Sequence, residues 1–278
     1  MKIGIIGGAG KMGKWFSRFF LNEGAEVKVS GRSKEKLLKL AEELKVEVAE
    51  NNVDCVKDVD IVMISVLFQN FEDLVKEIGP HIKSNQTVLD ITSVKELPVK
   101  IMHKYIKNGI VLGTHPMFGP KVEAKGQNFV LTPITTKEKK FAKEFKGWLT
   151  KRGFNVTIIS PKKHDELMSV VLGFSHFIGL TACDTLLKSK FKELKNVSGT
   201  SFKMLLELIE NVISSDPEFY STLHMSLPDI EKVEEEFKKN VKEWLKIVKN
   251  KDRDKFIKRM TELNNEFNEL LKYSEKNE

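Results

Sequence analysis

The chain has 278 residues, of which 41% are hydrophobic and 31% charged, and its formal net charge is +7. This length allows one large domain or two smaller ones with a buried core, and the sequence has no low-complexity tract of the kind found in disordered or fibrous chains. Lysines alternate with glutamates, so the positive charge is spread over solvated helix faces and does not indicate a nucleic-acid-binding stripe.

Other features of the whole chain favour a cytoplasmic protein. The two cysteines, Cys55 and Cys183, are far apart and lie among apolar residues, as expected of buried thiols in a reducing compartment. The first residues have the pattern of a strand and not of a signal peptide. No uninterrupted apolar run approaches the ~20 residues of a membrane-spanning helix, so we expect no membrane segment.

The first 160 residues alternate between strand and helix patterns. Short apolar and β-branched runs predict strands at 2–7, 26–31, 60–66, 86–92, 110–115, 128–133 and 155–160. Amphipathic stretches predict helices at 14–24, 33–45, 71–80, 94–109 and 136–153, with an interruption of the fourth at Pro98. Regular alternation of this kind predicts a doubly wound, mainly parallel sheet of the Rossmann type.

From residue 161 onward the sequence has only helical periodicity. We therefore predict a dinucleotide-binding domain over 1–160 and an all-helical substrate and dimerisation domain over 161–278. The stretches 230–249 and 256–273 have long apolar stripes that need covering. A second subunit that forms a homodimer through these helices is our expectation, and packing on the chain's own helices is the alternative.

A glycine motif follows the first predicted strand and opens the first helix. Gly8, Gly10 and Gly13 form a G-x-G-x-x-G pattern with Lys11 and Met12 inside it. In this context the first glycine allows a tight turn, the second lets the backbone approach a pyrophosphate, and the third lets helix and strand pack closely. The helix N-terminus then faces the phosphates, so we predict a dinucleotide site here.

The end of the second strand bears on which dinucleotide binds. NAD sites usually place a carboxylate there, whereas this chain has Ser30, Arg32 and Ser33 and no acid. A guanidinium can pair with a 2′-phosphate, so NADP is favoured and NAD stays possible. After the strand at 60–66, the backbone of Val66 and Leu67 is expected to border the nicotinamide, by analogy with the fold.

Two neighbouring predicted strands place polar residues at the carboxyl edge of the sheet, where ligands bind in open α/β folds. Ser93 and Lys95 follow one strand, and His115 ends the other. An imidazole and a hydroxyl beside a nicotinamide suit the oxidation of an alcohol, because the imidazole accepts the hydroxyl proton as hydride leaves. We expect Lys95 to hold a substrate carboxylate.

The segments GTHPMFGP and DITSVK together resemble the prephenate dehydrogenase family of tyrosine biosynthesis, which includes arogenate dehydrogenases. The looser segments GFSHF and ENVISSDPEFY extend the resemblance into the helical part. The resemblance implies NAD(P)-dependent oxidative decarboxylation of prephenate, a small dicarboxylate, to 4-hydroxyphenylpyruvate. It also implies that His115 is the catalytic histidine, Ser93 its supporting serine and His176 a second histidine that contacts the substrate.

One position departs from the family pattern. Where family members usually have an arginine that binds a substrate carboxylate, this chain has Asn211, which cannot make a bidentate, charge-assisted bond. Lys203 is the first candidate to compensate, followed by Lys121 and Lys125. We also expect neither a regulatory domain nor a fused chorismate mutase.

The alternatives remain open at this point. Arogenate dehydrogenase shares every motif named above. An NADP-linked β-hydroxyacid-type dehydrogenase shares the architecture but relies on a catalytic lysine that nothing here singles out. A non-catalytic NADP sensor would explain the loss of the arginine at position 211.

Overall fold

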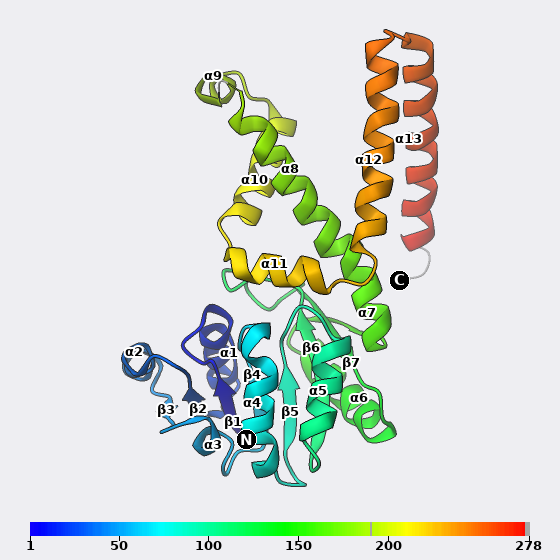
Figure 1. Cartoon of the computed structure of the whole chain (residues 1–278). Helices are drawn as coiled ribbons and strands as arrows, with labels where there is room; N and C mark the ends of the chain where they lie inside the picture. The colour runs from blue at the N-terminus through cyan, green and yellow to red at the C-terminus, as the bar shows by residue number, and fades with distance from the viewer. Residues whose placement is uncertain (190, 276–278) are drawn as a thin grey trace. The chain divides into compact units, whose positions relative to one another are not determined.

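A single eight-stranded sheet organises the N-terminal part of the computed structural model, which describes residues 1–189 and 191–275 (Figure 1). The strand order is β3-β2-β1-β4-β5-β6-β7-β8, and neighbouring strands are parallel except for β6 and β7. The strands are β1 (Lys2–Ile6), β2 (Glu26–Ser30), β3 (Glu47–Val48), β4 (Ile61–Ile64), β5 (Thr87–Asp90), β6 (Ile110–Pro116), β7 (Asn128–Thr132) and β8 (Asn155–Ile158). The prediction of a doubly wound, mainly parallel sheet is confirmed.

Helices cover both faces of this sheet. One face packs on α1 (Lys11–Asn22), α2 (Lys34–Leu44) and α6 (Thr136–Thr150), and the other on α3 (Asn52–Cys55), α4 (Phe71–Ile78) and α5 (Glu96–Tyr105). Two short 3₁₀ segments, η1 (Phe68–Asn70) and η2 (Gly79–His81), flank α4. This two-sided cover explains why the central strands are apolar at successive positions.

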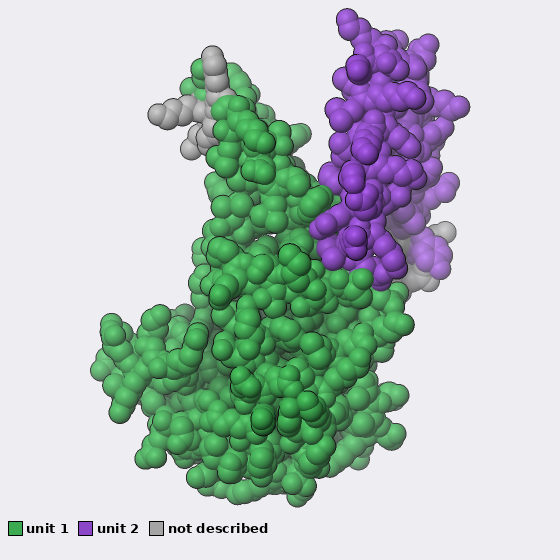
Figure 2. Space-filling model, viewed as in Figure 1, with its two compact units in different colours: residues 1–228 green, residues 229–278 purple. Residues whose placement is uncertain are grey.

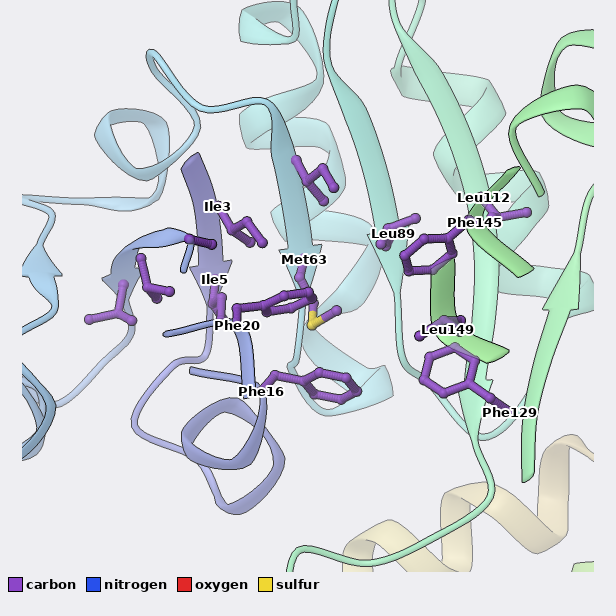
Figure 3. Packing of buried hydrophobic residues seen from close by; sticks show 14 of the residues in the cluster. Ile3, Ile5, Phe16, Phe20, Met63, Leu89, Leu112, Phe129, Phe145 and Leu149 are labelled. Carbon is purple, nitrogen blue, oxygen red and sulfur yellow. The ribbon is translucent and has the colours of Figure 1, made fainter. Parts of the chain in front are cut away.

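The core consists of two layers, one on each side of the sheet. Ile3 and Ile5 of β1 point into the first layer, where Phe16 and Phe20 of α1 lie against them (Figure 3). Ile6 points into the opposite layer. This is the two-residue alternation of a strand with both faces buried.

The structure corrects the expected interruption at Pro98. Helix α5 begins at Glu96 and runs on to Tyr105, so the proline lies in its first turn. The N–H groups of the first turn have no partner within the helix, and a proline there costs no hydrogen bond. The two-residue strand β3 and the one-turn helix α3 have patterns too short for the periodicity argument and were not predicted.

Among the residues that the structure describes after β8, the only regular elements are helices, as the sequence predicts. They are α7 (Pro161–Met168), a π-helical segment η3 (Ser169–Phe174), α8 (Ser175–Leu187), α9 (Phe191–Asn196), α10 (Thr200–Ile213), α11 (Pro217–Ser226), α12 (Ile230–Lys249) and α13 (Arg253–Glu275). The chain divides into two compact units, 1–228 and 229–278, shown in green and purple in Figure 2. The boundary predicted near residue 160 marks a change of secondary structure and stays a prediction; residues 190 and 276–278 of the predicted second domain lie outside the described residues.

One helical run after β8 is strongly apolar. Pro161–Leu187 passes the length and composition test for a membrane span, and 11% of its most apolar window is buried. The sequence interpretation missed this run, because it counted only uninterrupted apolar residues and Ser175 and Thr181 lie inside the helix. A single helix of this kind is a weak indication of membrane insertion, since an apolar helix in a globular protein passes the same test.

Candidate active site

The glycine turn between β1 and α1 has the geometry of a phosphate-binding loop. Gly7 has φ +85°, and its N–H and that of Gly8 both donate to the carbonyl of Ser30, at 2.8 and 3.0 Å. A Cβ on Gly13 would lie 2.3 Å from the carbonyl oxygen of Gly7. Helix α1 starts after Gly10 with no side-chain cap and no acidic residue in its first turn, so its N–H groups are left for a ligand.

Around this turn the other predicted cofactor residues lie in different environments. Lys11 and Arg32 are exposed and Met12 is half-buried. Ser33 caps α2 through a bond from the Lys36 N–H, so its hydroxyl already has a role in the fold.

Ser30 is buried, and its hydroxyl donates to Asn52 at 3.0 Å. Val66 and Leu67 are half-buried after β4, and a Cβ on Gly7 would lie 3.4 Å from the Val66 side chain. The glycine turn and the end of β4 are therefore adjacent, and the cofactor roles of these residues stay predictions.

A buried ion pair joins the ends of β5 and β6. The Lys95 ammonium bonds to the Asp90 carboxylate and donates to the carbonyl of Thr114 at 2.7 Å, and both charged side chains are 0% exposed. The Asp90 carboxylate also accepts from the Thr92 N–H and hydroxyl. Lys95 thus fixes the polypeptide on either side of the site, and this geometry argues against the predicted direct contact with a substrate carboxylate.

Strand β6 approaches its neighbours closely just before His115. A Cβ on Gly113 would lie 2.4 Å from the Thr132 hydroxyl and 2.6 Å from the Val99 side chain, so only glycine fits. The Thr114 hydroxyl donates to the carbonyl of Asp90. The strand is held tightly at the residue where the catalytic histidine is predicted.

His115 is joined to a second histidine and an aspartate. Its Nδ1 lies 2.8 Å from Nε2 of His164, and Nδ1 of His164 lies 2.7 Å from Oδ1 of Asp165. The Asp165 carboxylate accepts two further bonds, from the N–H groups of Lys95 at 2.7 Å and Glu96 at 2.8 Å. A continuous hydrogen-bonded chain therefore connects the predicted base to α7 and to the N-terminus of α5.

Both imidazoles of this chain are uncharged at neutral pH. Burial lowers the pKa of His115 well below the ordinary 6.5, and the nearby His164 and Lys95 lower it further. Burial also lowers the pKa of His164, against the opposing effect of its bond to Asp165. A neutral His115 can accept a proton, as the predicted role requires.

The loops beside His115 are anchored to the rest of the N-terminal sheet and helices. Ser93 is half-buried in the loop between β5 and α5, two residues before Lys95. After β6, the Phe118 ring packs on Trp15 of α1 with centroids 4.8 Å apart, and the Trp15 indole N–H donates to the carbonyl of Val122 at 2.8 Å. The segment that follows His115 is thereby tied to the helix that begins at the glycine turn.

His176 lies in a different cluster, between α8 and α11. Its ring is 4.4 Å from Tyr220 and 5.8 Å from His224, centroid to centroid. Burial, with a contribution from His224, lowers the pKa of His176 to about 4. Within the described part of the chain its Nδ1 is buried without a hydrogen-bond partner, so a ring nitrogen is left for a ligand.

The remaining predicted substrate residues lie on one helix. Lys203 and Asn211 are both exposed on α10, and Val212 of that helix packs against Gly179 of α8. Their roles in binding stay predictions. Across residues 1–189 and 191–275, no cluster of three or more His, Cys, Asp or Glu side chains could hold a metal ion.

Sequence reasoning missed His164 and Asp165. They lie in the segment PKKHDELM, next to a predicted boundary, and nothing in their spacing relates them to His115. The available signal was an adjacent His-Asp pair in the first helical turns after the last strand. Strand β8 runs antiparallel to β6, so its direction alone does not lead the chain to the carboxyl edge that carries His115.

Family models match almost the whole chain. Residues 16–158 match the model described as prephenate dehydrogenase, nucleotide-binding domain, and residues 160–262 match prephenate dehydrogenase, dimerization domain. A Methanocaldococcus jannaschii protein named "Probable arogenate/prephenate dehydrogenase" is 36% identical over 99% of this chain. The T-protein of Haemophilus influenzae is 26% identical over 92% of it. The chain covers 64% of the length of each of these two relatives.

Solved structures share the fold. Prephenate dehydrogenase from A. aeolicus, crystallised with hydroxyphenyl propionate and NAD+, has a TM-score of 0.81 at 21% identity, and the match covers 97% of this chain and 98% of that one. Synechocystis arogenate dehydrogenase has a TM-score of 0.75 at 16% identity, covering 97% and 99%.

Proposed function

This chain belongs to the prephenate dehydrogenase family, and we propose that it catalyses the oxidative decarboxylation of prephenate with a nicotinamide dinucleotide. The observation that supports this most is the buried, uncharged His115 at the carboxyl edge of the sheet, bonded to His164 and joined through the Asp90–Lys95 pair to the loop of Ser93. A base of this kind suits the oxidation of a secondary alcohol.

The glycine turn fits the cofactor. A Cβ on Gly13 would lie 2.3 Å from the carbonyl oxygen of Gly7, so a glycine there allows the tight turn, and the uncapped N-terminus of α1 presents N–H groups to a pyrophosphate. A bound nicotinamide ring would supply the hydride acceptor. The glycine turn would hold the pyrophosphate of the dinucleotide, and the backbone at the end of β4 would border the nicotinamide ring.

In the proposed reaction His115 accepts a proton from the substrate and later returns it. Hydride leaves the ring carbon that bears the hydroxyl, and His115 accepts the hydroxyl proton as the C–O bond becomes C=O. The bond to the ring carboxylate then breaks, CO2 departs, and its electron pair makes the ring aromatic. The proton returns to the oxygen, so the products are 4-hydroxyphenylpyruvate, CO2 and reduced dinucleotide. Ser93 supports this step by a hydrogen bond to the hydroxyl.

We favour NADP over NAD. Arg32 is exposed two residues after the end of β2, and that strand end has no carboxylate, which would repel a 2′-phosphate. The prephenate dehydrogenase from A. aeolicus was crystallised with NAD+, but at 21% identity its cofactor does not decide which dinucleotide this chain binds.

Prephenate and arogenate differ in the group next to the second carboxylate of the substrate. Arogenate carries an amino group beside that carboxylate, and the uncharged Asn211 tolerates a zwitterion better than an arginine would. Arogenate dehydrogenase is therefore the second candidate function. We propose that His176 contacts the substrate, because its buried Nδ1 has no hydrogen-bond partner among the described residues.

We further propose a homodimer formed through the C-terminal helices. Exposed apolar side chains recur along α13, among them Met260, Phe267 and Leu270, and the family model over residues 160–262 is described as a dimerization domain. Light scattering should give twice the chain mass of 31.8 kDa, and a monomeric mass would contradict this assembly.

The function is tested by mixing purified protein with prephenate or arogenate and with NADP or NAD. Formation of 4-hydroxyphenylpyruvate, or of tyrosine from arogenate, with matching reduced dinucleotide is expected. Tight dinucleotide binding without turnover of either substrate would favour a sensor.

A further inference from the structure

We propose that His164 and Asp165 form a positioning pair, which holds His115 in the single tautomer that can accept the substrate's proton. The catalytic part of this inference rests on the proposed function. The tautomer itself rests only on the hydrogen-bonded chain that runs from Asp165 to His115.

The direction of that chain is set at Asp165. Its carboxylate accepts the N–H of Lys95 on Oδ1 and the N–H of Glu96 on Oδ2. Backbone N–H groups only donate, and they stabilise an ionised carboxylate, which only accepts. The third bond of this carboxylate, to Nδ1 of His164, therefore has its hydrogen on the histidine.

The same argument continues along the two rings. A neutral His164 with its hydrogen on Nδ1 has a bare Nε2, and that nitrogen lies 2.8 Å from Nδ1 of His115. His115 must then carry its hydrogen on Nδ1 and donate it to His164. Its Nε2 is left bare, which is the state that a proton acceptor needs.

Local structure fixes this pair in place. Helix α7 starts at Pro161, and its N-cap Ser160 accepts the N–H of Lys163 at 3.2 Å, so the position of the first turn is defined. Both side chains are buried, His164 at 0% and Asp165 at 4% exposure. A fixed, dry pair can orient an imidazole without reorganising during the reaction.

The pair also has a consequence after proton transfer. When His115 becomes an imidazolium, its Nδ1–H already points to His164, whose own N–H points to the Asp165 carboxylate. The new positive charge therefore develops at the end of a chain that terminates in a negative charge. Without the pair, His115 would be free to carry its hydrogen on Nε2, where it blocks the acceptor.

Two substitutions of His164 separate positioning from packing. His164→Gln offers an amide oxygen to the Nδ1–H of His115, whereas His164→Phe fills the space and offers no acceptor. We expect His164→Phe to lower kcat by about 100-fold with KM and dinucleotide affinity changed by less than about threefold, and His164→Gln to retain most of kcat. Equal losses in both variants, in parallel with their Tm, would mean that His164 only packs.

A spectroscopic measurement tests the tautomer in the full chain without any turnover. In protein labelled with ¹⁵N-histidine, the His115 signals are assigned by their loss in His115→Asn. Wild type should show His115 protonated on Nδ1 and bare on Nε2, and His164→Phe should move the hydrogen to Nε2. A wild-type His115 protonated on Nε2 overturns the proposal, even if His164→Phe does not fold.

The two proposals fail in different ways. If neither prephenate nor arogenate is oxidised while His115 has the expected tautomer, the proposed function is wrong and the positioning pair stands as a feature of the site. If turnover occurs and the tautomer is the opposite one, the pair is overturned and the function is kept.

Discussion

The ammonium of Lys95, the residue before α5, pairs with the carboxylate of Asp90 at the end of β5 in a fully buried contact. The same ammonium bonds to the carbonyl of Thr114, the residue before His115. The ion pair thus holds in place the strand that carries the proposed base. Removing it should therefore lower the stability of the fold, whereas a substrate ligand would change KM.

Lys95→Met should destabilise the fold, because it leaves the Asp90 charge buried without a partner. We expect the free energy of unfolding to fall by about 3–5 kcal/mol in urea denaturation. Lys100→Met is the matched control, since Lys100 forms an exposed pair with Glu96 and should change stability by less than about 0.5 kcal/mol. Wild-type stability with a raised substrate KM would instead assign Lys95 to the substrate carboxylate.

The glycine turn can be tested with two helical glycines. Gly13→Ala would put a Cβ 2.3 Å from the Gly7 carbonyl, so we expect a loss of about 1–3 kcal/mol in stability and weaker dinucleotide binding. At Gly147, inside α6, a Cβ meets nothing within 4 Å. Gly147→Ala should stabilise by about 0.5–1 kcal/mol. If calorimetry gives Gly13→Ala the same NADP affinity as wild type, the glycine turn is not part of the cofactor site.

Arg32→Ala tests the choice of dinucleotide. If the guanidinium pairs with a 2′-phosphate, the variant should bind NADP about 10–100-fold more weakly, while NAD affinity changes little. Lys39→Ala removes one positive charge from α2, where Lys39 pairs with Glu35, and should leave both affinities unchanged. If Arg32→Ala weakens the affinity for NADP and for NAD equally, this residue does not recognise the 2′-phosphate.

Stability should decline on the acid side of neutrality. The folded-state pKa values of His115, His164 and His176 are lowered, that of His176 to about 4. Between about pH 6.5 and 4 the unfolded chain therefore binds more protons, and the free energy of unfolding falls as the pH falls. Urea titrations at several pH values should show this slope, and it should be smaller in His176→Gln. If the free energy of unfolding of His176→Gln falls with pH as steeply as that of wild type, His176 does not contribute to the pH dependence of stability.

The sequence predicted the elements whose signal is local. The glycine motif, the alternation up to residue 160 and the position of His115 at a strand end all follow from spacing and composition. What it did not predict depends on contacts between distant segments: His164 meets His115 across 49 residues. Lys95 lies at the start of a predicted helix and was interpreted as a substrate ligand, because only the folded chain brings Asp90 and Thr114 around its ammonium.

Pro98 illustrates the opposite error. A proline inside a helical pattern usually marks a break, but the periodicity could not show that α5 begins at Glu96. The start is defined by Asp165, whose carboxylate accepts the N–H of Glu96 from another helix. The same contact that positions the histidine pair therefore also decides where α5 begins.

The central claim is that His115 accepts the substrate proton, and His115→Asn tests it most directly. Steady-state turnover of prephenate or arogenate should fall by about 10²–10⁴-fold in kcat, with the Tm and the dinucleotide affinity close to those of wild type. A folded His115→Asn variant that retains the wild-type kcat would contradict the account.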